Sequence, residues 1–453
     1  MGIKDFQPHI RKTYDGAFKE KWLDTYDNLY IDINYVLHLL CYSTETEEEL
    51  VIKLKDFLVS LMKNNVPTKR LYLIADGVAP MAKMILQRER RINKTNNEIT
   101  QLSLKLTVGT KFMSDLQFHL TDFVKYIEDN YKIKVIIMFI EPGEGEIKIR
   151  KQVQQTQNEN KNDTHIVFSS DSDMVMLLMT CDDVSKIYII IKNKINTLIL
   201  NVGKLYEIHI EKFGKTKTAK YDFVFLNILM GNDYLPHVSC SKFDNLWQSY
   251  KIFSNNFEEG LVIYDTTYIK INKIFLSCIL LNLLKHEKPV YVNKFKIKTL
   301  FNQETRITYE KYCEGLYWCL GMYIMGYCSD YEYIYDTKTK PHIVGVLNTL
   351  MAKDTYEIKI TNPINYELYG MLIVPKIARK ILLSKKQNNI VKQLEILHTQ
   401  FYEPIITKEL IKEIIKSFNE INENYKNDTE VHKENKIITQ TYEPYRKFLR
   451  RLF

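Results

Sequence analysis

Seven acidic residues stand at or just after the ends of predicted strands and helices, where they could act together. Carboxylates crowded into one crevice repel each other unless cations neutralise them, and Mg²⁺ prefers such hard oxygen ligands. Two divalent ions can activate water and stabilise the leaving oxygen in phosphodiester cleavage. We therefore expect two Mg²⁺ ions, with Mn²⁺ as a substitute. The seven residues are Asp32, Asp76, Glu144, Glu146, Asp171, Asp173 and Asp233.

Each acidic segment has a simpler interpretation when it is taken alone. A pair such as Asp171 and Asp173 usually forms a loop or a helix cap, and Gly143-Glu-Gly-Glu146 would usually be a solvated turn. One aspartate at a strand end is common in any α/β protein. Five acidic segments at successive element ends are much harder to explain in this way, so we favour the joint interpretation.

A basic segment follows Asp76 directly. If residues 81–92 form a helix, Lys83, Gln87, Arg90 and Arg91 share one face by their spacing. Arginine offers forked donors that suit a terminal phosphate. The alternative is a solvated basic helix, and only the neighbouring acidic cluster favours the phosphate hypothesis.

The apolar pattern predicts the elements that must position these groups. Short apolar runs at 29–33, 71–75, 135–140 and 165–168 are typical of buried parallel strands. Helical spacing at 47–63 and 114–131 predicts helices between them, and 187–191 with 197–202 predicts a further strand pair. The carboxyl ends of parallel strands share one edge, where ligands bind. We expect an α/β fold: a mainly parallel twisted sheet flanked by helices, with a largely helical C-terminal region.

The pattern changes after about Pro236, which predicts three parts. They are a catalytic domain (1–240), a helical connecting segment (241–300) and a helical region packed on the core (301–453). Within them we expect a buried helix at 274–284, a Tyr-rich helical stretch at 305–335 and a charged helix at 376–422. A basic run closes the sequence at 445–453, where it could bind RNA or end a helix.

Composition limits the protein class. Hydrophobic residues make up 45% and aromatic residues 12% of the 453 residues, as in folded proteins. The net charge of +8 permits a polyanionic partner without requiring one. Seven cysteines without paired spacing predict free thiols and no zinc module. Because no signal peptide or membrane-spanning run is visible, we expect a soluble intracellular protein, in the cytoplasm rather than the nucleus.

Taken in order, the motifs resemble those of the Xrn family of 5′→3′ exoribonucleases. The resemblance covers about the first 240 residues, with a fainter match from Glu314 to Tyr335. The chain is shorter than cellular members, and we expect a compact form such as a virus could encode. The matching segments are Met1-Gly-Ile3, Leu29-Tyr-Ile-Asp-Ile-Asn34, Asp76-Gly-Val-Ala-Pro-Met-Ala-Lys-Met84, Arg88-Glu-Arg-Arg91, Gly109-Thr-Lys-Phe-Met113, Pro142-Gly-Glu-Gly-Glu-Ile-Lys148, Asp171-Ser-Asp173 and Gly231-Asn-Asp-Tyr-Leu-Pro-His237.

The resemblance implies a catalytic core like those of PIN and flap nucleases, with the seven acids as its metal ligands. It also implies that Lys83, Gln87, Arg90 and Arg91 form a pocket for a 5′-monophosphate. The substrate would be decapped or cleaved single-stranded RNA, degraded to nucleoside 5′-monophosphates.

The resemblance also implies two residues that stack on the RNA bases. His38 would stack on the first base, and such stacking accepts any of the four bases. The family's second stacking residue is a Trp, and Tyr331 or Tyr333 could replace it here. Packing inside a helix is an equal alternative for these two tyrosines. Two further departures from the family pattern are Val108, where Pro is usual, and Tyr35, where Gly is usual.

Two rival functions stay open. A structure-specific flap-type DNA nuclease would use a similar acidic cluster, although the Asp76–Pro80 and Pro142–Glu146 motifs favour the RNA enzyme. An inactive RNA-binding scaffold is the second rival. The presence of all seven acids speaks against it, because drift in an inactive protein should have removed some of them.

Overall fold

A computed structural model describes most of the chain. Its contacts form two compact units, residues 1–383 and 384–453. The basic run at 445–453 lies outside the described residues, and the predicted three-part division remains a prediction. The described residues are 3, 5–19, 23–64, 66–94, 101–169, 171–192, 197–239, 242–265, 268–285, 303–335, 340–353, 356 and 359–426.

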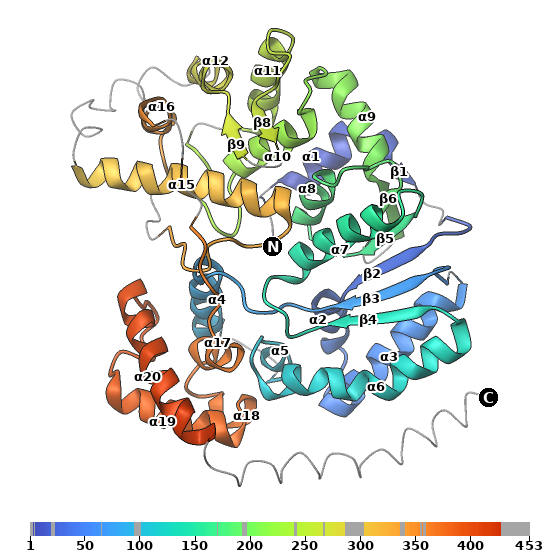
Figure 1. The fold of residues 1–453 in the computed structure, drawn as a ribbon, viewed down its shortest axis with the longest axis vertical. Coiled ribbons are helices and arrows are strands. Elements are labelled where there is room, and N and C mark those ends of the chain that lie inside the picture. The colour runs from blue at the N-terminus through green and yellow to red at the C-terminus, as the bar shows by residue number, and fades with distance from the viewer. Residues whose placement is uncertain are drawn as a thin grey trace. The chain divides into compact units, whose positions relative to one another are not determined.

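A seven-stranded sheet forms the centre of the first unit (Figure 1), in the order β1-β7-β6-β5-β2-β3-β4. Strands β4, β3, β2, β5 and β6 are parallel, whereas β7 runs antiparallel to both β6 and β1. The mainly parallel sheet is confirmed, and β1 is the strand that the sequence did not predict. The strands are β1 (Phe18–Lys19), β2 (Asn28–Asp32), β3 (Arg70–Ile74), β4 (Lys134–Met138), β5 (His165–Phe168), β6 (Ile187–Lys192) and β7 (Thr197–Asn201).

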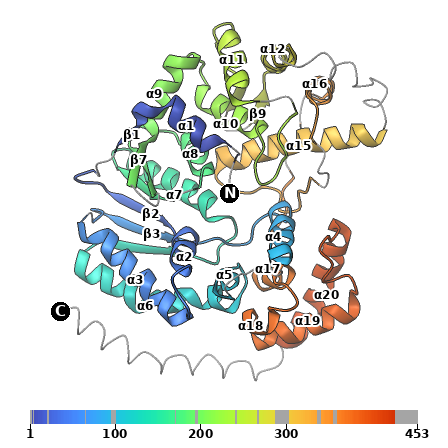
Figure 2. The ribbon, with the colours of Figure 1, turned by 180° about the vertical axis from the view of Figure 1, so that it is seen from behind.

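Helices cover both faces of this sheet, as two opposite views show (Figures 1 and 2). The predicted helices at 47–63, 81–92 and 114–131 are confirmed as α3, α4 and α6. The helices up to residue 229 are α1 (Phe6–Thr13), the short 3₁₀ turn η1 (Asp15–Ala17), α2 (Ile33–Cys41), α3 (Glu47–Asn64), α4 (Met81–Lys94), α5 (Gln101–Lys105), α6 (Lys111–Tyr131), α7 (Gly145–Glu159), α8 (Asp173–Met179), α9 (Val202–Phe213) and α10 (Ala219–Leu229).

Alternating side chains of the central strands build one core on each face. Leu29 and Ile31 of β2 point into a core that contains residues of α2, α3 and α6. Tyr30 points to the opposite face, where its ring stacks on Tyr72 at 4.5 Å, in a core that contains residues of α7 and α8. Because both faces are covered, the middle residues of these strands are mainly apolar, as those of buried parallel strands generally are.

The rest of the first unit is largely helical, as predicted, with one added hairpin. Helix α12 confirms the helix expected at 274–284, but only one face of it is buried, because Ile274 and Leu281 are exposed. The elements are α11 (Phe243–Ser254), β8 (Val262–Asp265), β9 (Tyr268–Ile271), α12 (Lys273–Leu284), α15 (Gln303–Met325), α16 (Ile343–Ala352), α17 (Tyr366–Ile373) and α18 (Arg379–Leu382).

The Tyr-rich helix expected at 305–335 is wrong in its second part. Helix α15 ends at Met325 because Gly326 takes a positive φ of 70° and donates its backbone N–H to the carbonyl of Met322. This is a common way for glycine to end a helix. Residues 331–335 therefore form no helix, and they pass instead along the start of α4.

The second unit consists of two described helices, α19 (Lys385–Leu397) and α20 (Lys408–Lys426). Ser384 and Gln387 form a reciprocal capping box at the start of α19. The charged helical character expected at 376–422 is confirmed, and it is distributed over α18, α19 and α20.

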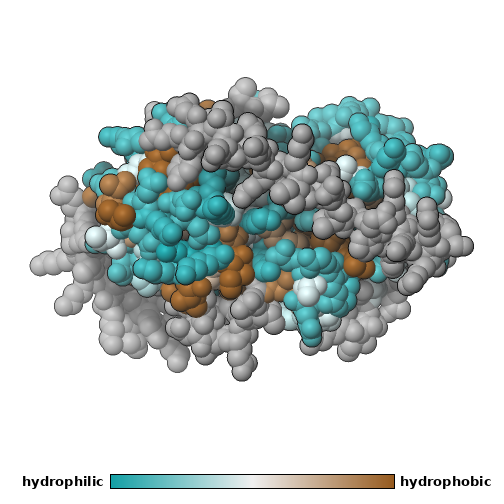
Figure 3. Space-filling model, turned by 90° about the horizontal axis from the view of Figure 1, so that it is seen from below, coloured by the Kyte–Doolittle hydropathy of each residue, from teal (hydrophilic) through white to brown (hydrophobic). Residues whose placement is uncertain are grey.

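The molecular surface seen in Figure 3 is mainly hydrophilic, with small hydrophobic patches. Among the helices of the described ranges, none combines the length and apolar character that crossing a bilayer requires. The six cysteines within those ranges are free thiols, as the seven cysteines of the whole sequence and their spacing predicted.

Two glycines in helices offer a matched test of the packing. A Cβ atom on Gly370 of α17 would lie 2.5 Å from the backbone of Gly109. One on Gly321 of α15 would meet only side-chain ends, Met325 at 3.2 Å and Ile269 at 3.7 Å. We expect Gly370→Ala to lower the free energy of unfolding by about 1–3 kcal/mol through overpacking. Gly321→Ala should change it by less than about 1 kcal/mol, because alanine is the better helix former. Urea denaturation measures both, and equal values would contradict the close backbone contact.

Candidate functional site

The strand order of the sheet reverses next to β2, and this creates the crevice where open α/β sheets bind ligands. Asp32 is the last residue of β2, and Asp171 follows β5, its neighbour in the sheet. Asp76 follows β3, on the other side of β2. Glu144 lies at the start of α7, after β4. The topology therefore gathers acidic residues at one edge of the sheet.

Asp32 is held in place by the start of α2. Its Oδ1 accepts the backbone N–H of Tyr35 at 3.1 Å as the helix N-cap, and its Oδ2 accepts the hydroxyl of Ser169 at 3.2 Å. Burial, together with the charges of Asp76 and Asp171, raises the pKa of Asp32 to about 7. The three carboxylates therefore lie close enough to interact strongly.

Glycines join the loop after β3 to the loop after β4. The N–H of Gly77 donates to the carbonyl of Gly143 at 2.8 Å, and the N–H of Gly143 donates to that of Val78 at 2.8 Å. A Cβ on Gly77 would stand 1.9 Å from the carbonyl oxygen of Glu141. Asp76 fixes the same junction, because its Oδ1 accepts the N–H of Gly145 at 2.7 Å. Gly77 is thus needed for close backbone approach, and Gly143 is needed for its positive φ of 105°.

Lys83 lies between two of the acids. Its Nζ is 2.6 Å from Oε2 of Glu144 and 2.6 Å from Oδ2 of Asp233. Arg90 contacts the other oxygen of Asp233 at 3.2 Å. Burial raises the pKa of Asp233, but Lys83 and Arg90 outweigh it and hold that pKa below its usual value. Glu144 behaves differently: burial and Asp76 outweigh Lys83, and its pKa is raised.

The acids around α8 are the most strongly perturbed. Burial, followed by the charges of Asp171 and Asp233, raises the pKa of Asp173 to about 8. Burial, with Asp171 and Asp173, also raises the pKa of Glu146 well above its usual range. All seven acids found in the sequence therefore belong to one interacting set, joined by charge, hydrogen bonds or Lys83.

The donor chemistry of this set fits divalent cations. The acids are oxygen donors, their crowding favours neutralisation by cations, and Oδ1 of buried Asp173 has no hydrogen-bond partner among the described residues. Across those same residues, however, no three acidic, His or Cys side chains surround one point as ligands would. Lys83 already contacts Glu144 and Asp233, so these carboxylates would have to reorient to share an ion.

Helix α4 presents the predicted basic face beside the acids. Lys83 and Arg90 face Asp233, whereas Gln87 accepts the hydroxyl of Tyr369 at 3.1 Å and Arg91 lies 3.5 Å from the carbonyl of Ser103. All four side chains are partly buried, on the face of α4 that the spacing predicted. The sequence did not predict that Lys83 would contact two carboxylates, Glu144 and Asp233, or that Arg90 would contact Asp233.

The three predicted stacking residues occupy different environments. His38 is exposed on α2, two turns after Asp32. Tyr331 and Tyr333 are buried, and the ring of Tyr333 stacks on Trp318 at 4.5 Å. The carbonyls of Tyr331 and Tyr333 accept the first N–H groups of α4. The backbone of this segment therefore positions the basic helix, and its tyrosine rings pack in the core.

The sequence did not reveal three polar side chains that support the acids. Tyr234 donates its hydroxyl to Glu144, and Tyr323 donates to Asp173 at 3.0 Å. Buried Lys148 holds the β4–α7 loop through the carbonyl of Glu141 at 3.0 Å. Tyr234 and Lys148 stand inside the acidic motifs and could have been suspected. Tyr323, far along the chain in α15, carries no such signal.

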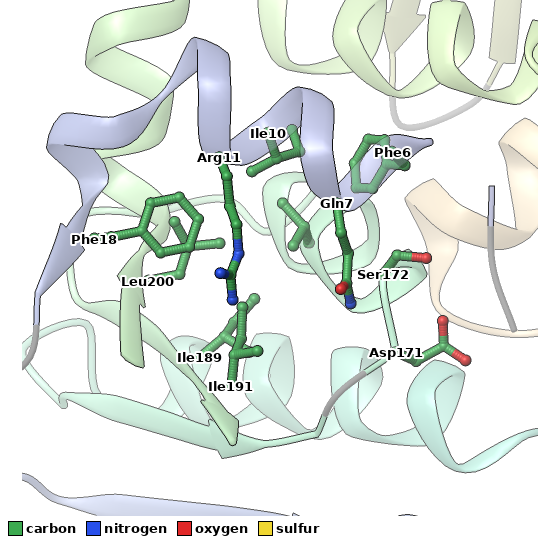
Figure 4. Close-up of a pocket in the computed structure, with 11 residues that line it drawn as sticks. Phe6, Gln7, Ile10, Arg11, Phe18, Asp171, Ser172, Ile189, Ile191 and Leu200 are labelled. Carbon is green, nitrogen blue, oxygen red and sulfur yellow. The ribbon is translucent and has the colours of Figure 1, made fainter. Parts of the chain in front are cut away.

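A recess borders the acidic set on the side of α1 (Figure 4). Asp171 and Ser172 form one end of it, while the side chains of Phe6, Ile10 and Phe18 supply an apolar wall. The guanidinium of Arg11, which lies 6.0 Å from the ring of Phe18, enters the recess from α1. Asp171 therefore stands at the border between this recess and the other acids, with its carboxylate directed away from the apolar wall (Figure 4).

The raised pKa of Asp32 gives a test of stability against pH. A carboxyl whose pKa is higher in the folded state, about 7 against 3.8, stabilises the fold at low pH. This contribution is lost as the pH rises through 7, at about 1.4 kcal/mol per pKa unit. Asparagine caps helices as well as aspartate. In EDTA, Asp32→Asn should therefore melt a few degrees above the wild type at pH 8, and the gap should close towards pH 4.

Added Mg²⁺ provides the control for this experiment. It should raise the melting temperature of the wild type at pH 8 more than that of Asp32→Asn, because a cation relieves the same repulsion. A melting temperature difference that does not change between pH 4 and pH 8 would contradict the crowding of charges described above.

The sequence of the part of the chain that carries most of these acids matches a known protein family. Residues 1–193 match the family described as the XRN 5′-3′ exonuclease N-terminus. This matched segment contains β1 to β6 and six of the seven acids, whereas Asp233 lies beyond it.

Several curated exoribonucleases are similar to the chain. The 5′-3′ exoribonuclease 1 of Schizosaccharomyces pombe is 28% identical over 297 residues, which cover 52% of this chain and 22% of that protein. The human 5′-3′ exoribonuclease 1 is 26% identical, with 52% and 17% covered. The 5′-3′ exoribonuclease 2 homolog of Drosophila melanogaster is 31% identical over 193 residues, with 34% and 21% covered. The chain thus spans about a fifth of these relatives.

Two solved nuclease structures resemble the structure of this chain, both with low TM-scores. The catalytic core of Rad2 in complex with DNA substrate has a TM-score of 0.34 and 16% identity, covering 56% of this chain and 68% of that one. The T5 D15 protein co-crystallised with metal ions has a TM-score of 0.35 and 12% identity, covering 58% and 90%. The sequence matches decide the assignment: residues 1–193 are an XRN 5′-3′ exonuclease N-terminal domain, and the chain is a distant homologue of the 5′-3′ exoribonucleases 1 and 2.

Proposed function

We propose that this protein is a metal-dependent 5′→3′ exoribonuclease that acts on single-stranded RNA with a 5′-monophosphate. It would release nucleoside 5′-monophosphates from decapped or cleaved RNA. The observation that carries this proposal is the placement of the basic face of α4 directly against the acidic set. Arg90 and Lys83 both contact Asp233, so groups that suit a terminal phosphate adjoin groups that suit cations.

The acids would hold two divalent ions, with Mg²⁺ preferred and Mn²⁺ able to replace it. The proposed ligands are the seven acids named from the sequence. Bound ions would supply Lewis acidity and an activated water for phosphodiester hydrolysis.

The protein's own groups would bind and orient the RNA. Arg90, Arg91 and Gln87 would donate to the 5′-phosphate, because forked guanidinium groups match phosphate oxygens. When cations neutralise Glu144 and Asp233, the ammonium of Lys83 could turn to the same phosphate. His38, exposed on α2 beyond Asp32, would stack on a base without selecting its identity. By the resemblance to the family, such a pocket would be too tight for a cap or a triphosphate.

A substrate panel tests the proposal as a whole. The protein is incubated with Mg²⁺ and matched RNA and DNA strands that carry a 5′-monophosphate, a 5′-hydroxyl or a 5′-triphosphate. We expect fast loss of the 5′-monophosphate RNA and mononucleotide products. Equal cleavage of DNA flaps would replace the RNA assignment with a flap-type DNA nuclease. Binding of RNA without cleavage, in Mg²⁺ or Mn²⁺, would favour a scaffold.

The acidic set makes a prediction about one residue. Asp171→Ala should reduce kcat by at least about 1,000-fold, because Asp171 is coupled by charge to Asp32, Glu146 and Asp173 and removal of one metal ligand typically costs several kcal/mol of transition-state stabilisation. The control is Asp265→Ala, which removes an exposed carboxylate from the β8–β9 hairpin and should leave the rate unchanged. Single-turnover cleavage of labelled RNA measures both, and an active Asp171→Ala would refute the ligand assignment.

The basic face makes a second prediction. Arg90→Ala should reduce the preference for 5′-monophosphate over 5′-hydroxyl RNA by about 10- to 100-fold, the usual range for a hydrogen bond to a charged group. Arg306→Ala, which removes an exposed arginine from α15, is the matched control. The ratio of kcat/KM for the two RNAs is the measurement. If the ratio is unchanged while both rates fall together, Arg90 serves only to orient Asp233.

A further inference from the structure

Helix α15 comes from outside the segment that matches the exonuclease family, yet one of its side chains reaches the acidic set. The hydroxyl of Tyr323 donates to Oδ2 of Asp173 at 3.0 Å, across 150 residues of sequence. Tyr323 is 1% exposed and Asp173 is 4% exposed. The bond is therefore shielded from water, and nothing in solution can readily replace it.

Tyr323 contacts α8 at both of its ends. Its hydroxyl binds Asp173, the first residue of α8, while its backbone carbonyl accepts the hydroxyl of Thr180, the residue that caps the end of α8, at 2.8 Å. Arg150 of α7 donates to the same Thr180 hydroxyl at 3.0 Å. One residue thus fixes both the position of α8 and the rotation of its first carboxylate.

Among the described residues, no second hydrogen bond holds the Asp173 carboxylate. Its second oxygen, Oδ1, lacks a hydrogen-bond partner among the residues that the structure describes. If the Tyr323 hydroxyl were removed, neither oxygen would be held, and the carboxylate would be free to rotate. Glu144 has a parallel arrangement, with its oxygens held by Tyr234 and Lys83.

We propose that Tyr323 is a positioning residue for the metal site: its hydroxyl orients the Asp173 carboxylate so that Oδ1 is free to bind a cation. This inference rests on the proposed function, because it assumes that the acids bind metal. It assigns a direct role in the site to the C-terminal half of the chain. A phenylalanine at this position would keep the packing and lose the orientation.

Tyr323→Phe in the full-length protein is the test, with Tyr250→Phe as its matched control. Tyr250 is also a buried tyrosine that donates to a buried aspartate, Asp222, at 2.8 Å, but Asp222 is not one of the seven acids. Both variants lose one buried tyrosine–carboxylate hydrogen bond, so similar small decreases in melting temperature are expected. The control separates a loss of stability from a loss of metal binding.

Mn²⁺ binding, measured by isothermal titration calorimetry, is the readout that does not depend on activity. Tyr323→Phe should raise the dissociation constant for Mn²⁺ about 10-fold, as the loss of a hydrogen bond to a metal ligand commonly does. Tyr250→Phe should bind Mn²⁺ with the affinity of the wild type. Cleavage assays should show a lower kcat for Tyr323→Phe with unchanged KM for RNA, and a higher Mg²⁺ concentration should recover part of the loss.

The outcomes distinguish this inference from the proposed function. A folded Tyr323→Phe protein with wild-type Mn²⁺ affinity and wild-type kcat would overturn the positioning role alone. Equal weakening of Mn²⁺ binding in both variants would also overturn it, because the effect would then come from general loosening. A wild type that binds Mn²⁺ but cleaves no RNA would refute the proposed function, and weaker Mn²⁺ binding by Tyr323→Phe would still support the positioning role.

Discussion

Mutual repulsion among buried carboxylates is the constraint on which the rest of this structure depends. Asp32, Glu146 and Asp173 all have pKa values raised by burial and by neighbouring acids. Such a cluster opposes folding at neutral pH unless cations or fixed donors offset it. Much of the surrounding structure can be understood as the supply of those donors: a helix N-terminus for Asp32, a backbone N–H for Asp76 and a lysine for Glu144 and Asp233.

This constraint explains why the later part of the chain is bound so closely to the first 193 residues. Helix α15 supplies Tyr323 to Asp173, and α17 supplies Tyr369 to Gln87 and a backbone carbonyl to buried Arg88. The segment at 331–333 receives the first N–H groups of α4. The matched exonuclease segment therefore contains most of the acids and several of the donors that hold them, while Tyr234 and Tyr323 supply further donors from beyond it.

The same crowding links stability to function. A site that binds divalent cations must keep its acids close together before the ions arrive, and this costs stability in the metal-free protein. Lys83 reduces that cost by contacting two of the acids. Its position between the acids and the phosphate-binding face would also connect the two proposed binding events, because cations would compete with it for the same carboxylates.

The sequence by itself predicted six of the seven strands of the sheet, helices α3, α4 and α6, and the gathering of the acids at one edge. Apolar runs, and the acids that follow them, can be recognised from neighbouring residues in the sequence. A parallel sheet then brings the carboxyl ends of its strands to the same edge. The sequence did not determine that Lys83 would contact carboxylates, that Tyr333 would pack against Trp318, or that α15 would end at Met325. Tertiary structure decided these points because each depends on contacts between distant segments or, at Gly326, on a backbone conformation. A hydrogen bond such as that between Tyr323 and Asp173 joins residues 150 positions apart, and no local pattern encodes it.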